Sequence, residues 1–498
     1  MIYLNDTMIK EKGTRKGTRK RKKGKLTSVD FFMMSFGSMV GVGWTVSSNH
    51  WLAQAGGPWP AFIGFIIGTI LLVPIGLSYG ELMGALPVNG GVMTYSYRAF
   101  GSVVAFFSSW FVALAYLTIL PWEAIYINRI VTNFIPWFRD GLVLYQVNGQ
   151  DVYLRAGILG LFLAAFLLLM NYKGSKFAAK MQNIFTWIII AVGLLTIVLS
   201  FILSDGINLM PFYKNIGIGK HNSPYTGIMT MVVIVPFFMA GFDTVSQSIE
   251  EAKPSLTFKK IARSLVISIL AAGIFYALII ISTAGVEPWA DYAREDTPAI
   301  AMLMRRAFPG FMGKALHGIV LFGTLAGLLS TWNGMFMAAG RLLQSMGRAG
   351  LISLWFAKDH PRYKTPTNAF AFCFVAAAAG PFVGFGFIDP LTNLGSVAFV
   401  MGWFFTCLSA IKLRGDAPDL RRPFRIPGGR MMLFLALMIS GAILILCFIP
   451  GQSAFMGKVG VILFLAWSVL GAIFYFITNG GDRGMSEKER RRKIFPWR

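Results

Sequence analysis

Two short stretches decide the fold, Gly37-Ser38-Met39-Val40-Gly41-Val42-Gly43 and Pro236-Phe237-Phe238-Met239-Ala240-Gly241-Phe242-Asp243. Each lies halfway along an apolar segment that is long enough to cross a bilayer as a helix. Glycine inside a helix costs about 1 kcal/mol, and proline removes an amide donor and clashes with the preceding turn. Because unwound backbone is tolerated at membrane depth only where it is buried in protein or lines a cavity, we predict that both helices are broken beside a cavity.

The composition around these stretches is that of an all-α, multi-pass membrane protein. Apolar residues make up 55% of the 498 residues and charged residues 14%, against roughly 25% charged in ordinary soluble domains. The mean hydropathy is +0.61. We predict about twelve membrane-spanning helices, at 29–55, 60–85, 101–130, 153–172, 181–203, 227–248, 262–284, 313–340, 366–387, 389–411, 431–450 and 458–478.

The basic residues predict the orientation of these spans. With both termini in the cytoplasm, 36 of the 46 Lys and Arg residues fall on the cytoplasmic side, which is the usual asymmetry of membrane proteins. Ten of them lie in the tract Lys10–Lys25 directly before the first span, where we expect them to contact anionic membrane lipid. The tract has no interleaved aromatic residues, so nucleic acid is not an expected partner. The predicted location is the plasma (inner) membrane.

The two broken helices also predict an internal repeat. Five spans separate their starts, so they cross the membrane in opposite directions, as in an inverted repeat of five plus five helices. The predicted organisation is a basic tail at 1–28, a first repeat at 29–203, a second repeat at 227–411, two further helices within 431–478 and a basic tail at 479–498. Corresponding breaks in two such halves are typical of a transport site near the membrane midplane.

The chemistry of such breaks suits a zwitterion. Amides freed at the start of one half-helix can hold a carboxylate, helped by the helix dipole. Carbonyl groups freed in the other break can hold an ammonium group, so an amino acid fits both. The alternative interpretation is that Gly37 and Gly41, four residues apart, only permit close helix packing. The matching break at Pro236 and Gly241 favours the transport site.

Several motifs, in their order and spacing, resemble the amino acid–polyamine–organocation superfamily of permeases over residues 29–430. They are the glycine motif at 37–43, Gly80-Glu81-Leu82, the turn Leu86–Gly91 followed by Tyr95, Arg98, Phe100 and Gly101, then Phe237–Asp243, Glu250–Pro254, and Asn333-Gly334 with Arg341. The resemblance implies a LeuT-like fold with helices 1 and 6 unwound, and a secondary transporter of amino acids rather than an enzyme. The alternatives are a polyamine or cationic amine exchanger on the same fold, or a non-transporting amino acid sensor.

The resemblance also implies a substrate site made of Met39, Val40, Gly41, Val42, Gly43, Phe237, Phe238, Ala240 and Gly241. In this interpretation the amides of the first five residues receive the substrate carboxylate. Carbonyl groups around 237–241 receive its amino group, and the ring of Phe237 closes over it.

Further candidates for gating or coupling are Glu123, Asp243, Glu250, Glu251, Ser330, Thr331 and Arg341. Ionisable residues inside membrane spans are functional candidates by default. Glu123 is expected to bind a cationic side chain or relay a proton, unless it pairs with Arg129 or reaches the outer interface. Asp243 is expected to fix structure or gating. One carboxylate of the pair at 250–251 is expected to bind Arg341 and close the inward gate.

Two departures from the family pattern bear on the energy source. Val42 supplies no hydroxyl where many relatives have Ser or Thr, and Ile189 takes the place of a lysine of proton-coupled relatives. Sodium prefers oxygen ligands, which Ser330 and Thr331 would supply together with carbonyl groups of the first span. Na+ coupling, H+ coupling and ion-independent exchange are all compatible with the sequence. No other cofactor, metal site or protein partner is predicted.

Overall fold

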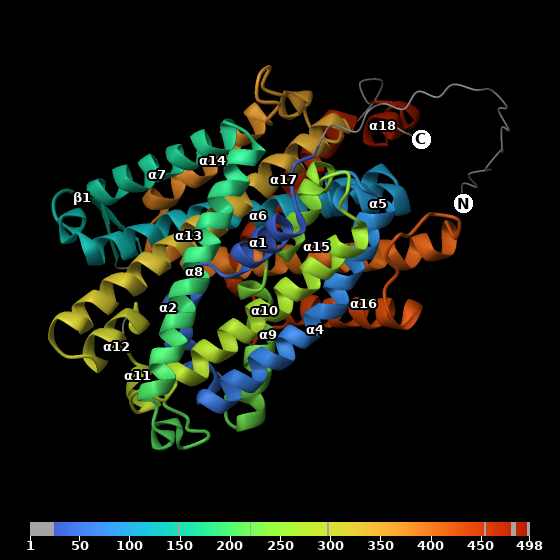
Figure 1. The fold of residues 1–498 in the computed structure, drawn as a ribbon. Coiled ribbons are helices and arrows are strands. Elements are labelled where there is room, and N and C mark those ends of the chain that lie inside the picture. Colours follow the sequence, from blue (N-terminus) through green and yellow to red (C-terminus); the bar gives the residue numbers. More distant parts are fainter. Residues whose placement is uncertain are drawn as a thin grey trace.

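The computed structural model describes residues 24–147, 150–219, 221–295, 298–452, 455–479 and 485–495, and they form an almost entirely helical bundle (Figure 1). Most of the basic tract before the first span lies outside the described residues. The uninterrupted long helices are α4 (Pro58–Ala85), α6 (Ser102–Phe134), α7 (Leu154–Tyr172), α8 (Ser175–Leu203), α10 (Phe258–Ala284), α13 (Gly310–Arg348), α14 (Thr367–Val383), α15 (Ile388–Asp416), α16 (Gly429–Leu446) and α17 (Gly457–Asn479).

Two further membrane segments consist of consecutive shorter pieces. The first comprises α1 (Ser28–Met39), α2 (Gly43–Val46) and α3 (Ser48–Ala55), and the second comprises α9 (Pro224–Phe238) and the 3-10 helix η3 (Phe242–Glu251). The remaining elements are α5 (Val92–Phe100), η1 (Pro136–Arg139), β1 (Val143–Val147), β2 (Gln150–Tyr153), η2 (Gly206–Leu209), α11 (Trp289–Tyr292), α12 (Ala299–Ala307), η4 (Leu354–Ala357), η5 (Phe385–Phe387) and α18 (Glu487–Ile494).

A helix occurs at each of the twelve predicted spans. Eleven segments of the described chain are long and apolar enough to cross a membrane, and the ninth predicted span is the shorter α14, of 17 residues. That helix ends at Val383 because Gly384 takes the left-handed φ of 84°. The all-α fold class is confirmed, with one difference: β1 and β2 pair as an antiparallel hairpin in a loop after α6. A short helix, α12, begins just after Pro298.

The interrupted helix α1 lies inside the bundle, and α17 lies at its edge. Of the most apolar stretch of Ser28–Val46, 83% is buried, compared with 11% for the segment Gly457–Thr478. In contact with α1 are α8, α10, α13 and η3. The exposed apolar face of α17 suits contact with lipid. This helix is held to α6 by Trp110 and Trp467, whose stacked indoles each donate to the other's backbone carbonyl, at 2.9 and 3.1 Å.

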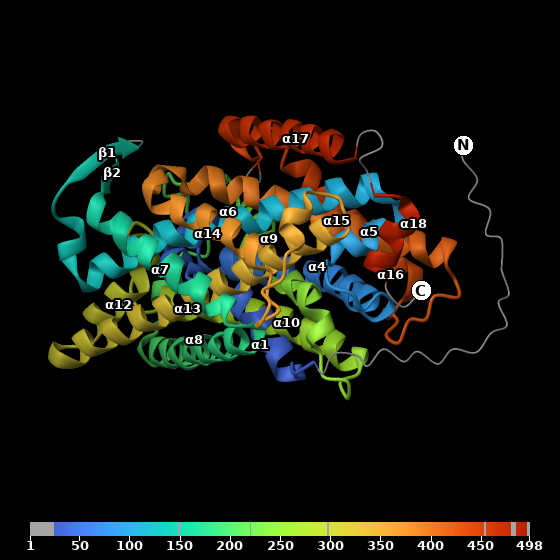
Figure 2. The ribbon, with the colours of Figure 1, turned by 90° about the horizontal axis from the view of Figure 1, so that it is seen from above.

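Loops that the charge pattern assigns to opposite membrane faces lie at opposite ends of the molecule. The hairpin and α12 lie at one end, and α5 and α18 lie at the other, in both views (Figures 1 and 2). At the second end the amide of Leu26 donates to the carbonyl of Glu251 at 2.9 Å, and the Tyr97 hydroxyl donates to Glu487 at 2.6 Å. The first and last described segments therefore share one end, as an even number of crossings requires.

Helix α18 is docked on the bundle rather than extended from it. Its Arg490 guanidinium donates to the carbonyl of Ala349, just after α13, at 2.9 Å. The following Phe495 is 1% exposed, and its ring lies 6.2 Å from that of Tyr97 in α5. The C-terminal segment thus connects α5 to the end of α13.

A buried ion cluster joins α4 to the end of α15. Glu81, 1% exposed, accepts two hydrogen bonds from Arg414, at 2.8 and 2.5 Å, and one from the amide of Ile426 at 2.8 Å. Arg422 lies 3.5 Å from the same carboxylate. The Glu81 carboxylate thus ties α4 to the end of α15 and to the segment that follows it.

We predict that Glu81→Gln lowers the free energy of unfolding by about 3 kcal/mol, the lower end of the cost of breaking a buried ion pair, because Arg414 is partly exposed. The measurement is chemical or thermal unfolding in detergent. The matched control is Glu489→Gln, which breaks the exposed pair with Lys493 at 3.1 Å and should change the value by less than about 1 kcal/mol. Equal effects of the two substitutions would contradict the prediction.

Candidate functional site

The first break lies between Met39 and Gly43. The α1 helix ends at Met39, and Val40 adopts φ −91° and ψ 85°, outside the helical region. The Val40 amide still donates to Phe36, at 2.8 Å, and the Gly41 amide makes a longer bond to Met39, at 3.2 Å. Among the described residues, no acceptor is found for the amides of Val42 and Gly43. The sequence analysis assigned the amides of residues 39–43 to the substrate carboxylate. Of these five, the amides of Val42 and Gly43, at the start of α2, are the ones without a partner among the described residues.

The second break follows Phe238 and depends on a glycine. Gly241 adopts φ 117°, a left-handed value that disfavours other residues, and η3 begins directly after it. The carbonyl of Phe237 accepts the Ala240 amide at 3.2 Å. No donor of the described residues reaches the carbonyl oxygens of Phe238 and Ala240. This break therefore offers acceptors, whereas the first break offers donors.

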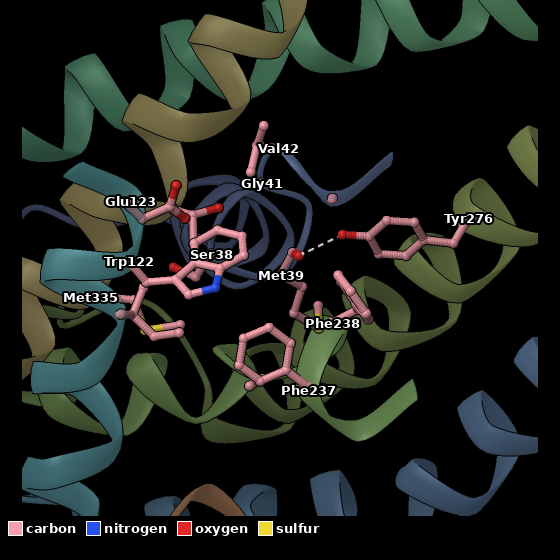
Figure 3. A pocket seen from close by; sticks show the side chains of 14 residues that line it. Ser38, Met39, Gly41, Val42, Trp122, Glu123, Phe237, Phe238, Tyr276 and Met335 are labelled. Carbon is pink, nitrogen blue, oxygen red and sulfur yellow. Dashed lines mark hydrogen bonds between the residues drawn. The ribbon is translucent and has the colours of Figure 1, made fainter. Parts of the chain in front are cut away.

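The two breaks face one small cavity (Figure 3). Val42 and Gly43 line it at the first break, and Phe238 and Ala240 line it at the second. Its large apolar lining residues are Met39, Ile119, Trp122, Phe237 and Met335, and its polar side chains come from Ser38, Glu123, Tyr276 and Thr331. The cavity measures about 30 Å³, which is room for roughly two water molecules. The described conformation is therefore closed around the breaks.

Glu123 from α6 is the carboxylate of this cavity. Its side chain is 1% exposed, and its Oε2 has no hydrogen-bond partner among the described residues. Its Oε1 would lie 3.5 Å from a methyl group on Gly41, so it reaches the first break (Figure 3). The side chain of Arg129, the alternative partner, lies outside the described part of the chain. An interior carboxylate without a partner is costly, and a cationic group or a proton would compensate it.

Ser330 and Thr331 lie beside the first break, at the carbonyl of Gly37. Their hydroxyls donate to that oxygen, at 2.9 and 3.3 Å. The α8 side chains that complete this group are Gln182 and Thr186, and the Gln182 amide donates to the Ser330 hydroxyl at 2.8 Å. The sequence analysis missed both α8 residues. The available signal was the spacing of these two polar residues, which are four apart and therefore lie on one face of α8.

Asp243 is buried but does not line the cavity. The Tyr116 hydroxyl donates to its Oδ2 at 2.5 Å, which ties α6 to the start of η3. Its other oxygen has no hydrogen-bond partner among the described residues. The structure therefore separates Asp243 from Glu123, which the sequence analysis grouped as gating candidates.

Of the two carboxylates at the end of η3, Glu251 is the one that binds Arg341. The guanidinium of Arg341 lies 2.8 Å from Glu251 and also donates to the hydroxyl of Ser248. Glu250 instead accepts a hydrogen bond from the amide of Asn89 at 3.3 Å, and its own amide donates to the Asn89 side chain at 3.0 Å. Together these contacts join α13, η3 and the turn before α5 at the end that carries both described termini.

The two breaks and the helical bundle agree with the family comparison. A sequence profile of the amino acid permease family matches residues 26–476. The chain belongs to the amino acid permease family. The superfamily inferred from the motifs is thereby confirmed, and the permease is a multi-pass membrane protein and not an enzyme.

Individual relatives of this permease are distant but similar over most of its length. The branched-chain amino acid permease BcaP of Bacillus subtilis is 28% identical over 91% of this chain and 93% of its own. The methylthioribose transporter of the same species is 25% identical over 91% and 92%. The aspartate-proton symporter of that species is 26% identical over 80% and 74%. The relatives share a permease scaffold and differ in the substrates that their names state.

Proposed function

We propose that this permease is a secondary transporter that moves amino acids across the plasma membrane by alternating access, with both termini in the cytoplasm. The observation that carries the proposal is the pairing of free donors and free acceptors around one cavity. The amides of Val42 and Gly43 suit a carboxylate, and the carbonyl groups of Phe238 and Ala240 suit an ammonium group. Membership of the amino acid permease family supports the same function.

The wall of the cavity supports a substrate with an apolar side chain. Met39, Ile119 and Met335 offer no charged group to a side chain. A pocket with a few convergent polar groups and an otherwise apolar lining is the usual form of a small-molecule site. The name of the BcaP relative, a branched-chain amino acid permease, agrees with such a substrate.

The small volume of the cavity supports alternating access. The cavity of about 30 Å³ is smaller than an amino acid, so substrate entry requires one side of the site to open. On the proposed cytoplasmic side, Arg341 and Glu251 hold α13 against η3. On the other side, the rings of Trp122 and Phe237 approach edge to face at 6.0 Å. Each set of contacts is a gate in this proposal.

A second candidate function is exchange of polyamines or cationic amines. Glu123 favours it because its carboxylate reaches the cavity without a partner among the described residues. The same carboxylate is also the group available for proton coupling, since Ile189 replaces the lysine of proton-coupled relatives. The name of one relative, an aspartate-proton symporter, makes a coupling proton plausible.

We expect the purified permease in proteoliposomes to take up a labelled amino acid with an apolar side chain. The panel includes branched-chain, aromatic, acidic and cationic amino acids and spermidine, each with and without sodium and proton gradients. Stimulation by one gradient identifies the coupling ion. Uptake dependent only on internal amino acid indicates exchange. Binding without uptake would identify a sensor. If no compound of the panel is bound or transported, the proposal is wrong.

Glu123→Gln separates the two roles of this carboxylate. If it binds a cationic substrate, the variant should lose roughly tenfold or more in affinity for arginine or spermidine, the value of one charge-assisted hydrogen bond, and keep its affinity for leucine. If it carries a proton, the variant should lose stimulation by the proton gradient and retain exchange of internal for external substrate. A variant that behaves like the wild type in both assays contradicts both roles.

We predict that Gly41→Leu and Gly241→Leu abolish substrate binding. A Cβ at Gly41 would lie 2.4 Å from the Thr331 hydroxyl, and one at Gly241 would lie 2.7 Å from the carbonyl of Ser38. The matched control is Gly318→Leu, because a Cβ there meets no atom within 4 Å. Size-exclusion elution in detergent checks insertion and folding, and equilibrium binding of the best substrate checks the site. Normal binding by the Gly41 variant would contradict the assigned site.

Reversing the charges of the gate pair should restore transport. Arg341→Glu and Glu251→Arg are each expected to reduce uptake, because each leaves a charge unpaired and shifts the balance between the two open states. The double variant re-forms the pair and should recover uptake. The control pair Arg341→Glu with Glu250→Arg should not recover it, because Glu250 contacts Asn89 instead. Recovery in both doubles, or in neither, counts against this gate.

A further inference from the structure

A second cavity lies directly behind the wall of the first. It measures about 70 Å³ and shares Phe237 and Phe238 with the proposed substrate cavity. Its far side is formed by Thr392, Ser396 and Val400 of α15, together with residues of α16. The two spaces therefore share an aromatic wall.

Trp122 from α6 completes this wall and is held in place. Its indole nitrogen donates to the hydroxyl of Thr392 at 2.9 Å, and Thr392 itself lines the second cavity. The indole also packs on Tyr126, with ring centroids 4.3 Å apart, and on Phe237 at 6.0 Å. The residue is 6% exposed. In Figure 3 its ring projects from α6 towards the centre of the site, facing Phe237.

Trp122 and Phe237 differ in how firmly they are fixed. The indole has a hydrogen bond to another helix as well as ring contacts, whereas Phe237 has no polar group and is only partly buried. Phe237 also belongs to the end of α9, next to the helix break, whereas Trp122 lies within the continuous helix α6. We therefore expect the Phe237 ring to move when the outer gate opens, and the Trp122 indole to stay in place at the wall of the cavity.

We propose that Trp122 is the specificity-determining residue that limits the length of the substrate side chain, and that the second cavity is a latent extension of the substrate site behind it. This inference rests on the proposed function. A smaller residue at 122 joins the two spaces through the gap left by the indole. The enlarged site has an apolar lining with hydroxyls at its far end and takes bulky aromatic amino acids.

The test is a size series at this position, with Trp122→Phe, Trp122→Leu and Trp122→Ala in proteoliposomes. The measured quantity is the ratio of kcat/KM for tryptophan or phenylalanine to that for valine. We expect the ratio to rise stepwise along the series, by about tenfold or more for Trp122→Ala, since one methylene group in such a pocket changes selectivity by about 10-fold or more. This ratio of two kcat/KM values does not depend on the fraction of protein that folds, because both values scale with that fraction.

A refilling variant serves as the control. Trp122→Ala combined with Ser396→Phe places a ring in the second cavity from α15, so the ratio should return towards that of the wild type. Thr392→Val keeps the shape of the cavity but removes the acceptor of the indole proton, and it should raise the ratio only slightly. Thr392 acts here as a positioning residue.

The outcomes separate this inference from the proposed function. If the wild type transports none of the amino acids, the proposed function fails, whatever the variants do. If the wild type transports valine and every variant keeps the same ratio, Trp122 does not set specificity and the inference is overturned. If the ratio rises in Trp122→Ala but stays high when Ser396→Phe is added, the second cavity is not the space used, which also overturns it.

Discussion

The structure depends on the need to satisfy backbone polar groups where water is scarce. A break in a buried helix leaves amides and carbonyl groups that each cost several kcal/mol if they remain unpaired. Some of these groups are paired internally. The carbonyl of Met39 accepts the Tyr276 hydroxyl at 2.9 Å, and that of Gly241 accepts the Thr244 hydroxyl at 2.6 Å. The amides of Val42 and Gly43 and the carbonyl groups of Phe238 and Ala240 have no partner among the described residues, and all four lie in the lining of one cavity. These four groups mark the candidate site.

A chain of neutral hydrogen bonds fixes the position of the first break. Asn171 of α7 donates to Asn333 at 2.9 Å, Asn333 donates to Gln182 at 2.7 Å, and Gln182 donates to Ser330, which in turn binds the carbonyl of Gly37. Each side chain in this path is uncharged, and a network whose members are all paired rigidifies the helices that carry it. The break is therefore held by amides and hydroxyls from α7, α8 and α13. The carboxylate charge at the cavity comes from Glu123 on a fourth helix, α6.

The sequence was sufficient for the helices and the breaks and insufficient for the contacts between them. Apolar length located all twelve segments, and glycine and proline marked both breaks, because these signals are local. The roles of the amides at 40 and 41 were not predictable, since their bonds depend on the backbone angles of Val40. Pairings such as Trp122 with Thr392 join residues 270 positions apart, and only the packed fold brings them together. The choice of Glu251 over its neighbour Glu250 likewise depends on where η3 ends.

The two closures around the cavity differ in chemistry, and this difference affects what can open them. The contacts at the end carrying α5 and α18 are hydrogen bonds and an ion pair, in which the Arg341 side chain is 6% exposed and the Glu251 side chain 26% exposed. When this end opens, both charged groups can exchange their contact for hydrogen bonds to water. The closure at Trp122 and Phe237 is aromatic and has little to exchange with water. It opens by steric displacement, because a substrate side chain that enters the cavity must push a ring aside. In the proposed orientation, the outer closure therefore senses the size of the substrate, and the inner closure is sensitive to charge.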